Sequence, residues 1–332
     1  MANKPLLEIK KLNISLKVDD SFIPITEDVS FSIEPGKNLA LVGESGCGKS
    51  VTALSILRLL PIELKIVKGE ILFSRRNEKT VDIAGLPPKG KKIQAIRGGE
   101  IAMIFQEPMS SFSPLHSIGN QIVEVIHLHS SVSKKDAHNT AIELLKKVGI
   151  ADAKQAINRY PNAFSGGMRQ RAMIARALSC NPLLLIADEP TTALDVTIQA
   201  QILSVMKDLQ EEFGMAIIFI SHNMGVVAQM ADDVAIMYMG RIVEKGAVLE
   251  IFKHPKHPYT ANLLRVVPHL GTLEDRRRLE PIRGTVPSLF ERPPGCPFGS
   301  RCESFIPEKC NIRFPSLTQI KENHSVYCHL YN

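Results

Sequence analysis

Short apolar runs recur through the first three quarters of the chain, each of the length of a buried β-strand. Between several of them, apolar residues spaced three or four apart predict helices with one buried face; one such stripe is Ile198, Ile202, Val205, Leu209 and Phe213. Strands that alternate with helices predict an α/β fold in which helices cover the faces of a sheet. The predicted strands span residues 39–42, 101–105, 183–187, 216–220 and 234–239.

The hydrophobic pattern changes twice along the chain. After Gln106, Pro108 and Pro114 predict a loop, and helical patterns follow over residues 122–127 and 141–148. We interpret residues from about 107 to 170 as a helical insertion. After Gly246, residues 254–259 predict a stiff linker, and the remaining tail is rich in Pro and Cys. We therefore predict one large domain over residues 1–253 and a small C-terminal module over residues 254–332.

Composition limits the possible partners. The 332 residues are 44% hydrophobic, which suffices for a substantial core in one large or two medium domains. The net charge of +6 is modest, and the basic runs at 89–92 and 276–278 are interpreted as solvated loop charges. Aromatic residues are scarce and Trp is absent, so no nucleic-acid partner is expected. No run approaches the roughly 20 apolar residues of a membrane span, and no apolar leader is evident. In a transport system, other chains must supply the pore.

A glycine-rich loop follows the first predicted strand and precedes a helical run over residues 52–60. This strand–loop–helix context predicts a phosphate-binding loop of the Walker A type. Its glycines let the backbone N–H groups approach phosphates, and the helix N-terminus adds a partial positive charge. Lys49 is expected to bridge the β- and γ-phosphates, and the Ser50 hydroxyl to ligate Mg²⁺. The predicted nucleotide contacts are Gly43, Glu44, Ser45, Gly46, Cys47, Gly48, Lys49, Ser50 and Val51.

Two adjacent acids end the predicted strand at residues 183–187. Asp188 can reach the magnesium ion, usually through water, and Glu189 is expected to act as the general base that polarises the attacking water. A pair of acids at a strand end could alone be an exposed turn. Together with the phosphate loop, the pair predicts hydrolysis of a nucleotide.

The tract Phe164-Ser165-Gly166-Gly167-Met168-Arg169-Gln170-Arg171 lies between the phosphate loop and the acid pair, where a helix is predicted over 168–178. In this order, the three motifs resemble those of the ATP-binding cassette (ABC) superfamily, whose members close two units face to face over ATP. The resemblance implies an α/β P-loop NTPase fold, an ABC nucleotide-binding domain with a helical subdomain. It also implies that Ser165, Gly166 and Gly167 hold the γ-phosphate of ATP bound by the opposite subunit.

Three further residues take roles only through this resemblance. Gln106 matches the glutamine that senses Mg²⁺ and the attacking water and couples the site to the helical insertion; with Ser50 and Asp188 it is an expected magnesium ligand. Asp195, in Ala193-Leu194-Asp195, matches a loop that crosses the dimer interface. His222 matches the histidine that contacts the γ-phosphate, a role that suits an imidazole donor.

The sequence departs from the family pattern at two places. The family usually stacks adenine on an aromatic residue upstream of the phosphate loop; Leu16 falls near that place and Phe22 is the nearest aromatic, so the adenine contact stays open. Cys47 occupies a position usually held by a small hydroxyl residue. A thiol at a helix N-terminus can have a lowered pKa. We therefore expect alkylation of Cys47 to inhibit the ATPase and ATP to protect it.

Four of the six cysteines lie in the tail: Cys296, Cys302, Cys310 and Cys328. A disulfide framework is disfavoured in a reducing cytosol. The spacing C-x5-C-x7-C-x17-C is looser than that of zinc-finger pairs. Zinc, an iron–sulfur cluster and free thiols remain open from the residues alone.

The tail also carries a narrower resemblance. Its segments at 257–260, 294–298, 301–302 and 328–329 resemble the tail of ATP-binding subunits of bacterial dipeptide, oligopeptide and nickel importers. Some members of that group carry a 4Fe–4S cluster on these cysteines. The resemblance implies ATP and Mg²⁺ as cofactors and a peripheral position at the cytoplasmic face of the inner membrane. It implies two transmembrane permease subunits, a second and usually unlike cassette ATPase, and an extracytoplasmic substrate-binding protein.

The leading hypothesis is an ATPase subunit that energises import of di- or oligopeptides. A nickel or metal-chelate importer shares the same tail and is the alternative. A soluble cassette ATPase of DNA repair or of the ribosome is disfavoured, because repair members usually have long coiled-coil or zinc insertions and ribosomal members usually fuse two cassettes. A catalytically dead cassette is disfavoured by the presence of Lys49, Asp188, Glu189 and His222.

Overall fold

The computed structural model describes residues 4–76, 79–107, 111–192, 194–265, 282, 284–288 and 291–332. Pro108, Ala193 and the basic run at 276–278, on which expectations above rest, lie outside these ranges. The other basic run is partly helical rather than a loop, since Lys91 and Lys92 begin α2 (Lys91–Ile96), where both are exposed.

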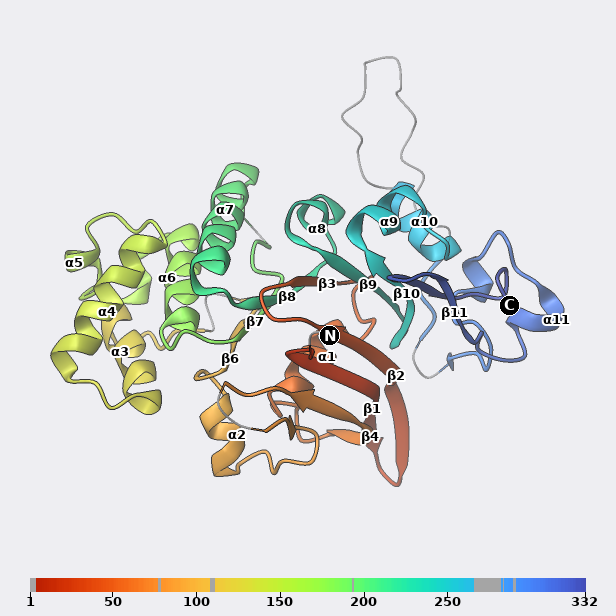
Figure 1. Cartoon of the computed structure of the whole chain (residues 1–332), viewed down its shortest axis with the longest axis horizontal. Helices are drawn as coiled ribbons and strands as arrows, with labels where there is room; N and C mark the ends of the chain where they lie inside the picture. Colours follow the sequence, from red (N-terminus) through yellow and green to blue (C-terminus); the bar gives the residue numbers. More distant parts are fainter. Residues whose placement is uncertain are drawn as a thin grey trace, which may run out of the picture.

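An eight-stranded sheet runs through the molecule in the order β11-β12-β10-β9-β3-β8-β7-β6 (Figure 1). Its parallel half consists of β9 (Asp233–Tyr238), β3 (Asn38–Val42), β8 (Ala216–Ser221), β7 (Leu184–Asp188) and β6 (Ile101–Ile104). These are the five strands predicted from the sequence, with ends displaced by one residue at most. β3, β7 and β8 are buried along their whole length. Continuous apolar runs suit such strands, because helices cover both faces of a parallel sheet.

The sheet continues beyond β9 as an antiparallel half. β10 (Arg241–Ala247) pairs with β9, and β12 (His324–Tyr327) pairs with β10 and with the edge strand β11 (Leu317–Lys321). The last strands of the chain therefore complete the main sheet. The C-terminal segment expected to form a small module of its own is packed into the large domain.

A second, four-stranded antiparallel sheet precedes and follows the phosphate loop in sequence and has no counterpart among the predicted strands. It contains β2 (Ser21–Ile33), β1 (Leu7–Val18), β4 (Leu64–Phe73) and β5 (Val81–Asp82), in that order. Its inner face shares one core with the main sheet and with α1 (Lys49–Ile56).

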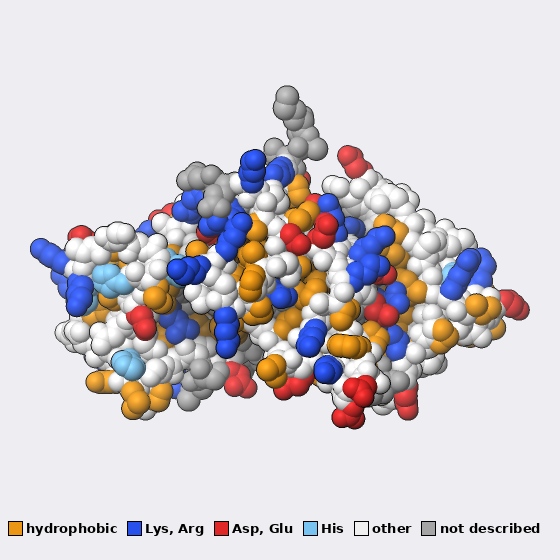
Figure 2. Space-filling model, turned by 90° about the horizontal axis from the view of Figure 1, so that it is seen from below, with side chains coloured by type: hydrophobic (Ala, Val, Ile, Leu, Met, Phe, Trp, Pro, Cys, Tyr) orange, Lys and Arg blue, Asp and Glu red, His pale blue; other side chains and the backbone are white. Residues whose placement is uncertain are grey.

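Lys, Arg, Asp and Glu side chains are interspersed over the molecular face seen from below (Figure 2).

α1 is shorter than the helix expected over residues 52–60. It starts at Lys49, directly after the phosphate loop, and ends at Ile56, and Arg58 has a left-handed backbone with φ of 54°. The early stop follows from this turn rather than from Pro61.

The predicted helical insertion lies at one end of the molecule (Figure 1). It contains α3 (Ile118–His129), α4 (Lys134–Lys147), α5 (Ala153–Ala156), the short 3-10 helix η1 (Pro161–Ala163) and α6 (Gly166–Leu178). Ser117 and Ser133 cap the N-termini of α3 and α4 by accepting hydrogen bonds from backbone N–H groups. The insertion shares a core with β6, β7 and β8 and with α7 (Val196–Phe213).

Residues 254–259 do not form the expected linker. His257 and Tyr259 are 1% and 0% exposed, and α10 (Pro258–Arg265) begins within this segment. Together with α8 (Met224–Met230) and α9 (Val248–Lys253), these residues pack with Tyr238 and Phe298 in a third core. The rest of the tail contains the 3-10 helix η3 (Gly299–Arg301) and α11 (Pro307–Cys310). Within the described ranges, no helix combines the length and apolarity needed to cross a membrane.

Candidate active site

The glycine-rich loop joins β3 to α1 and is shaped by glycines that no larger residue could replace. A Cβ on Gly43 would lie 2.2 Å from the Met237 carbonyl oxygen. Gly48 caps α1 with φ of 99°, in the left-handed region that L side chains rarely adopt. The loop therefore lies close against β9 and leads directly into the N-terminus of α1, a position that favours anions.

Lys49 is folded into this loop. Its side chain is buried, and its ammonium donates to the carbonyl oxygens of Gly43 at 2.8 Å and Glu44 at 3.0 Å. Its charge also acts on the acid pair: it opposes the rise that burial causes in the pKa of Asp188, and it contributes to the lowered pKa of Glu189. The predicted phosphate-binding lysine is therefore held between the loop and the acid pair.

Asp188 ends β7 and is only 5% exposed. Burial raises the pKa of its carboxyl and the charge of Glu189 adds to this effect, whereas a hydrogen bond with Ser50 and the charge of Lys49 act in the opposite direction. Its Oδ1 atom is buried and has no hydrogen-bond partner among the described residues. A carboxylate with an unused oxygen beside a hydroxyl is a suitable donor set for Mg²⁺, which prefers oxygen ligands.

Glu189 is the centre of a group built from three strand ends. Its Oε2 accepts from Gln106 Nε2 at 3.2 Å and from Thr192 Oγ1 at 2.9 Å, and its Oε1 accepts from His222 Nδ1 at 3.0 Å. Although partial burial favours the neutral acid, the hydrogen bonds from His222 and Thr192 and the charges of His222 and Lys49 lower the pKa of Glu189. The structure thus brings the three predicted catalytic residues together. Thr192 was not predicted, and its position three residues after Glu189 is the only signal for it.

The backbone at Glu189 is strained. Its φ of 47° lies in the left-handed region, which is uncommon for a residue other than glycine. Its N–H donates to the Ile220 carbonyl at 3.0 Å, which ties it to the neighbouring strand β8. Such conformations persist where the surroundings impose them, and they concentrate at functional sites.

The predicted trans contacts occupy the N-termini of two helices. Ser165 caps α6 by accepting from Met168 N at 3.3 Å, and Asp195 caps α7 by accepting from Ile198 N at 2.9 Å. A Cβ on Gly167 would press on Ile198, but one on Gly166 would meet nothing within 4 Å in its own chain. Steric conditions within the chain therefore do not explain the glycine at position 166.

Two family models match the chain. The model described as ABC transporter matches residues 26–192, and the model described as oligopeptide/dipeptide transporter, C-terminal region, matches residues 243–310. A Brucella ovis protein named as a peptide import ATP-binding protein is 48% identical over 99% of this chain and 98% of its own. This chain belongs to the ABC transporter family. It is an ATPase cassette of that family.

Another curated relative and a solved structure are also similar to this cassette. The dipeptide transport ATP-binding protein DppD of Bacillus subtilis is 45% identical over 98% of this chain and 94% of its own. Among solved structures, a dimeric post-hydrolysis state of the ATP-binding cassette MJ0796 with ADP and Pi matches with a TM-score of 0.64 at 25% identity. That match covers 73% of this chain and 98% of the other.

Two residues of the cassette's phosphate loop have surroundings that the sequence did not indicate. The Glu44 backbone N–H donates to Tyr259 Oη at 2.9 Å and its carboxylate pairs with Arg301, so Glu44 contacts the tail. Cys47 is only 4% exposed, and burial raises the pKa of its thiol, an effect that Lys49 opposes but does not cancel. The lowered pKa expected for the Cys47 thiol is therefore wrong, because burial outweighs the influence of Lys49, and inhibition by alkylation of Cys47 stays a prediction.

The candidates for the adenine contact lie in the β1–β2 hairpin. Leu16 pairs with Ile23 and is half-buried, whereas Phe22 is 52% exposed. This geometry does not select Leu16 or Phe22 as the residue that contacts adenine, so the adenine contact stays a prediction.

The four tail cysteines gather in one region of the cassette. Cys296, Cys310 and Cys328 are each 8% exposed, and Cys302 is half-buried. Burial, together with the neighbouring thiols, raises the pKa of Cys296 to about 12 and that of Cys328 to about 11. Among the described residues, no group of three or more His, Cys, Asp or Glu side chains is arranged to hold a metal ion. The thiols are thus close neighbours without forming a site for a single ion.

Proposed function

We propose that this cassette hydrolyses ATP to energise the import of di- or oligopeptides through a membrane transporter. The observation that carries the proposal is the match of residues 243–310 to the C-terminal region of oligopeptide and dipeptide transporters, in a chain that also carries the phosphate loop and the acid pair. The relatives named above for peptide or dipeptide transport match nearly the whole chain. The alternative cargo, nickel or a metal chelate, shares this tail and is an outcome of the test below.

The chemistry proposed for the site follows from its charges. The glycine-rich loop from Gly43 to Ser50 and the Lys49 ammonium bind the phosphates, and Ser50, Asp188 and Gln106 are the oxygen donors for Mg²⁺, which neutralises phosphate charge when it is bound. Because its pKa is lowered, Glu189 is ionised at neutral pH and can accept a proton from water. His222 and Gln106 hold this carboxylate from two sides and orient it.

We propose that two cassettes complete each other's sites. Ser165, Gly166, Gly167 and Asp195 would contact ATP or the interface of the partner, which explains a glycine at position 166 that its own chain does not require. The dimeric cassette MJ0796 supports such an assembly for its family. The partner is proposed to be a related but unlike cassette. ATP binding would close the pair and hydrolysis would open it.

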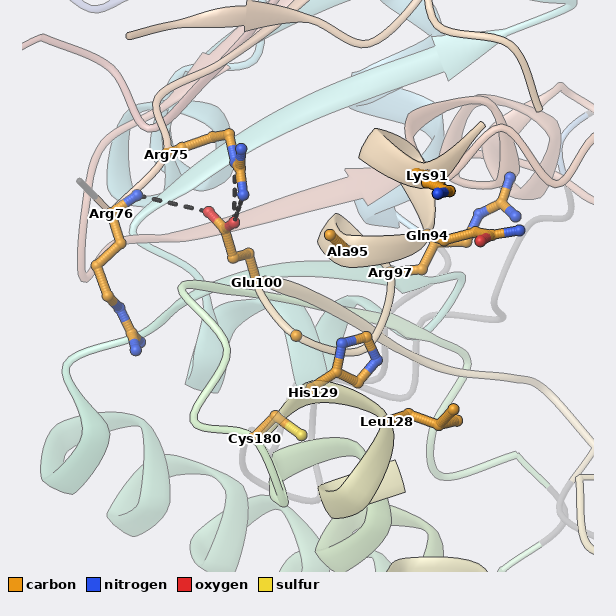
Figure 3. Close-up of a pocket in the computed structure, with 11 residues that line it drawn as sticks. Arg75, Arg76, Lys91, Gln94, Ala95, Arg97, Glu100, Leu128, His129 and Cys180 are labelled. Carbon is orange, nitrogen blue, oxygen red and sulfur yellow. Dashed lines mark hydrogen bonds and ion pairs between the residues drawn. The ribbon is translucent and has the colours of Figure 1, made fainter. Parts of the chain in front are cut away.

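The permease is proposed to dock on the seam between the main domain and the helical insertion. A cavity of about 840 Å³ opens there, with Arg75 and Arg76 on one side, α2 on the other, and His129 and Cys180 along the insertion (Figure 3). Arg75 is neutralised by Glu100 at 2.5 Å, but Lys91 adds positive charge at the rim, and Leu128 is 72% exposed. This lining suits a cytoplasmic permease segment with apolar and acidic side chains. Two such permeases and an extracytoplasmic binding protein would complete the transporter at the inner membrane.

We also propose a 4Fe–4S cluster on Cys296, Cys302, Cys310 and Cys328. The support is that four largely buried thiols lie close enough for their charges to influence one another, and such a cluster is held by four thiolates. Anaerobic purification followed by iron and sulfide analysis tests it. Protein without iron, and without a broad absorbance at roughly 400 nm, would refute the cluster while leaving the ATPase proposal intact.

The function is tested by capture of the whole assembly. The Glu189→Gln chain, held with ATP and Mg²⁺, is used as bait in detergent-solubilised membranes of the native cell, with Lys49→Ala as the control that should not bind ATP. Two permeases and a second cassette are expected with the first bait only. The reconstituted complex, with its binding protein, is then supplied with peptides or with nickel chelates. If nickel chelates stimulate ATP hydrolysis and peptides do not, the cargo is nickel rather than peptide. If the bait recovers ribosomal or DNA-repair proteins and no permease, the proposed transport function is refuted.

A further inference from the structure

The second residue of the phosphate loop is held by the far end of the chain. Glu44 N–H donates to Tyr259 Oη at 2.9 Å, across 215 positions of sequence. The Glu44 carboxylate accepts from Arg301 Nη1 at 2.7 Å and from Nη2 at 3.0 Å, across 257 positions. The backbone and the side chain of Glu44 are therefore fixed by two different segments of the tail. We call Tyr259, Arg301 and their contacts to Glu44 the loop clamp.

The ion pair of the clamp is well built. The Arg301 side chain is 4% exposed and that of Glu44 26% exposed, so the pair is largely shielded from water and salt. Two parallel N–H···O bonds between a guanidinium and a carboxylate fix direction as well as distance. Arg301 Nη1 also donates to Tyr238 Oη at 3.2 Å, and the hydrogen bond with Glu44 raises the pKa of Arg301 further above its usual range. The guanidinium thus keeps both its charge and its orientation.

The tyrosine of the clamp is equally restricted. Tyr259 is fully buried, and its ring lies 4.7 Å from that of Tyr238 and 5.4 Å from that of Phe298, centroid to centroid. Its N–H donates to His257 Nδ1 at 3.1 Å, which sets the start of α10. Because the rings are packed together, the Tyr259 hydroxyl has little freedom to leave Glu44.

The cysteine-bearing segment places Arg301. Arg301 ends η3, which follows the buried Phe298 and directly precedes Cys302. The Cys296 N–H donates to the Cys310 carbonyl at 2.7 Å, and a Cβ on Gly295 would lie only 2.0 Å from that oxygen. The backbone around the cysteines is therefore tightly folded, and it presents Arg301 to the phosphate loop.

The clamp acts at the beginning of the loop, directly after β3 ends at Val42. The Glu44 carbonyl accepts from Lys49 at 3.0 Å, so the amide and the carbonyl of Glu44 are both engaged. Beyond it, Gly46 and Gly48 allow a wide range of backbone conformations. A loop that the tail fixes at Glu44 samples fewer conformations than one held only by Lys49 and by the hydrogen bond from the Gly240 N–H to the Cys47 carbonyl at 2.9 Å.

We propose that Tyr259 and Arg301 are positioning residues that hold the phosphate loop in its nucleotide-receptive conformation. The hydrogen bonds described above join them to the phosphate loop at Glu44, and none of these bonds goes to the acid pair. When only a fraction of molecules has a competent site, the apparent affinity falls by that fraction. Loss of the clamp should therefore weaken ATP binding. Turnover at saturating ATP should be preserved, because bound ATP restores the loop and the group around Glu189 is built elsewhere.

The test compares Arg301→Ala and Tyr259→Phe with a matched control, Arg292→Ala, in the full chain. Arg292 is another arginine of the tail, its side chain is 8% exposed, and it pairs with Glu27 at 2.5 Å rather than with the phosphate loop. Binding of a fluorescent ATP analogue is measured on each chain, thermal unfolding checks the fold, and hydrolysis is measured in the assembled complex. We expect the Kd and KM for ATP to rise about tenfold in Arg301→Ala and about threefold in Tyr259→Phe, with kcat within about twofold of the parent. Arg301→Lys, which keeps the charge but loses the fork, should fall in between.

The control separates positioning from stability. Arg292→Ala should lower the unfolding temperature as Arg301→Ala does, but leave the Kd for ATP unchanged. A Kd within twofold of the parent in folded Arg301→Ala and Tyr259→Phe chains overturns the proposal, and so does an equal rise in Arg292→Ala. If Arg301→Ala does not fold, Tyr259→Phe, which loses one hydroxyl, decides alone. Glu44→Gln added to Arg301→Ala should weaken binding no further, because both changes remove the same contact. Nucleotide binding and thermal unfolding are measured on the single chain, without partner, peptide or import, so these two results stand or fall apart from the transport function.

Discussion

The two halves of the main sheet differ in how their important residues are supported. In the parallel half, Gln106, Glu189 and His222 follow the ends of three adjacent strands and bond to one another directly. Beside the antiparallel half, Tyr259 and Arg301 come from segments far apart in the sequence and reach the site only through Glu44. The first arrangement follows from sheet topology, because the carboxyl ends of parallel strands share one edge. The second depends on the packing of the tail.

The largest difference between the halves is expected for Glu189→Gln. The amide keeps the shape of the side chain but cannot take up a proton, so kcat should fall by about 10²–10⁴-fold, while ATP binding is retained. Phosphate release by the assembled complex measures this change. Glu212→Gln, at an exposed glutamate of α7 that pairs with Lys147, is the control and should leave kcat unchanged. A loss below tenfold in Glu189→Gln would remove Glu189 from the role of base.

The next effect should appear in stability rather than in turnover. Phe298 is fully buried against Tyr238 and Tyr259, and Phe298→Ala should lower the free energy of unfolding by about 3–5 kcal/mol. Denaturant unfolding measures it. Leu330→Ala, at a tail residue that is 46% exposed, should change the free energy of unfolding by less than about 1 kcal/mol. Equal losses in both variants would mean that the tail is not anchored through its aromatic cluster.

A smaller effect is expected in the pH dependence of stability, and it arises from His257 beside the antiparallel half of the sheet. Burial lowers the pKa of His257 from 6.5 to about 3, so the folded protein holds the neutral imidazole. The stability from this neutral form is complete above about pH 6.5 and is lost as the pH falls towards 3, because the unfolded chain binds the proton first. Between pH 7 and pH 5 the loss should be about 2 kcal/mol. Unfolding of the parent and of His257→Gln at both pH values measures it, and an identical pH dependence in the two proteins would contradict the assignment.

The smallest effect should be that of Cys47→Ser. The thiol is buried and its pKa is raised, so it offers little thiolate to an alkylating reagent. Cys47→Ser should alter kcat by less than about threefold, which corresponds to under about 1 kcal/mol. Mass spectrometry after brief alkylation of the folded protein should find Cys47 unmodified. Rapid modification of Cys47 with loss of ATPase activity would restore the view of a reactive loop thiol.

The parallel half could be predicted because its signals are local. A glycine-rich loop between a strand and a helix, or two acids after a buried strand, can be recognised within about ten residues, and parallel topology then brings distant strand ends together. Thr192 could not be predicted as a partner of Glu189, because a threonine hydroxyl in a turn can form many other hydrogen bonds. The N-terminal antiparallel sheet was missed because the pairing of β1 with β2 and with β4 shifts register several times, which breaks the simple alternation of sides.

The antiparallel side could not be predicted for a different reason. Residues 254–259 have the composition of a linker, yet His257 and Tyr259 are buried because the aromatic cluster provides a place for them. The pairing of β12 with β10 and of Arg301 with Glu44 joins segments that no local pattern relates. The environment of Cys47 could not be predicted for the same reason. Its position at the start of a helix is visible in the sequence, whereas its burial depends on the folded core.

The position of β12 has a consequence for how the protein is made. His324–Tyr327 lies within the last ten residues of the chain, yet it fills a place in the main sheet between β10 and β11. During synthesis the phosphate loop emerges early and stays without Arg301 until nearly the whole chain has been translated. A chain that stops before Arg301 would keep the phosphate loop and the acid pair and still lack the contacts of Arg301 with Glu44. If the loop clamp acts as proposed, a chain gains full affinity for nucleotide only after its tail has been made and has folded back onto the phosphate loop.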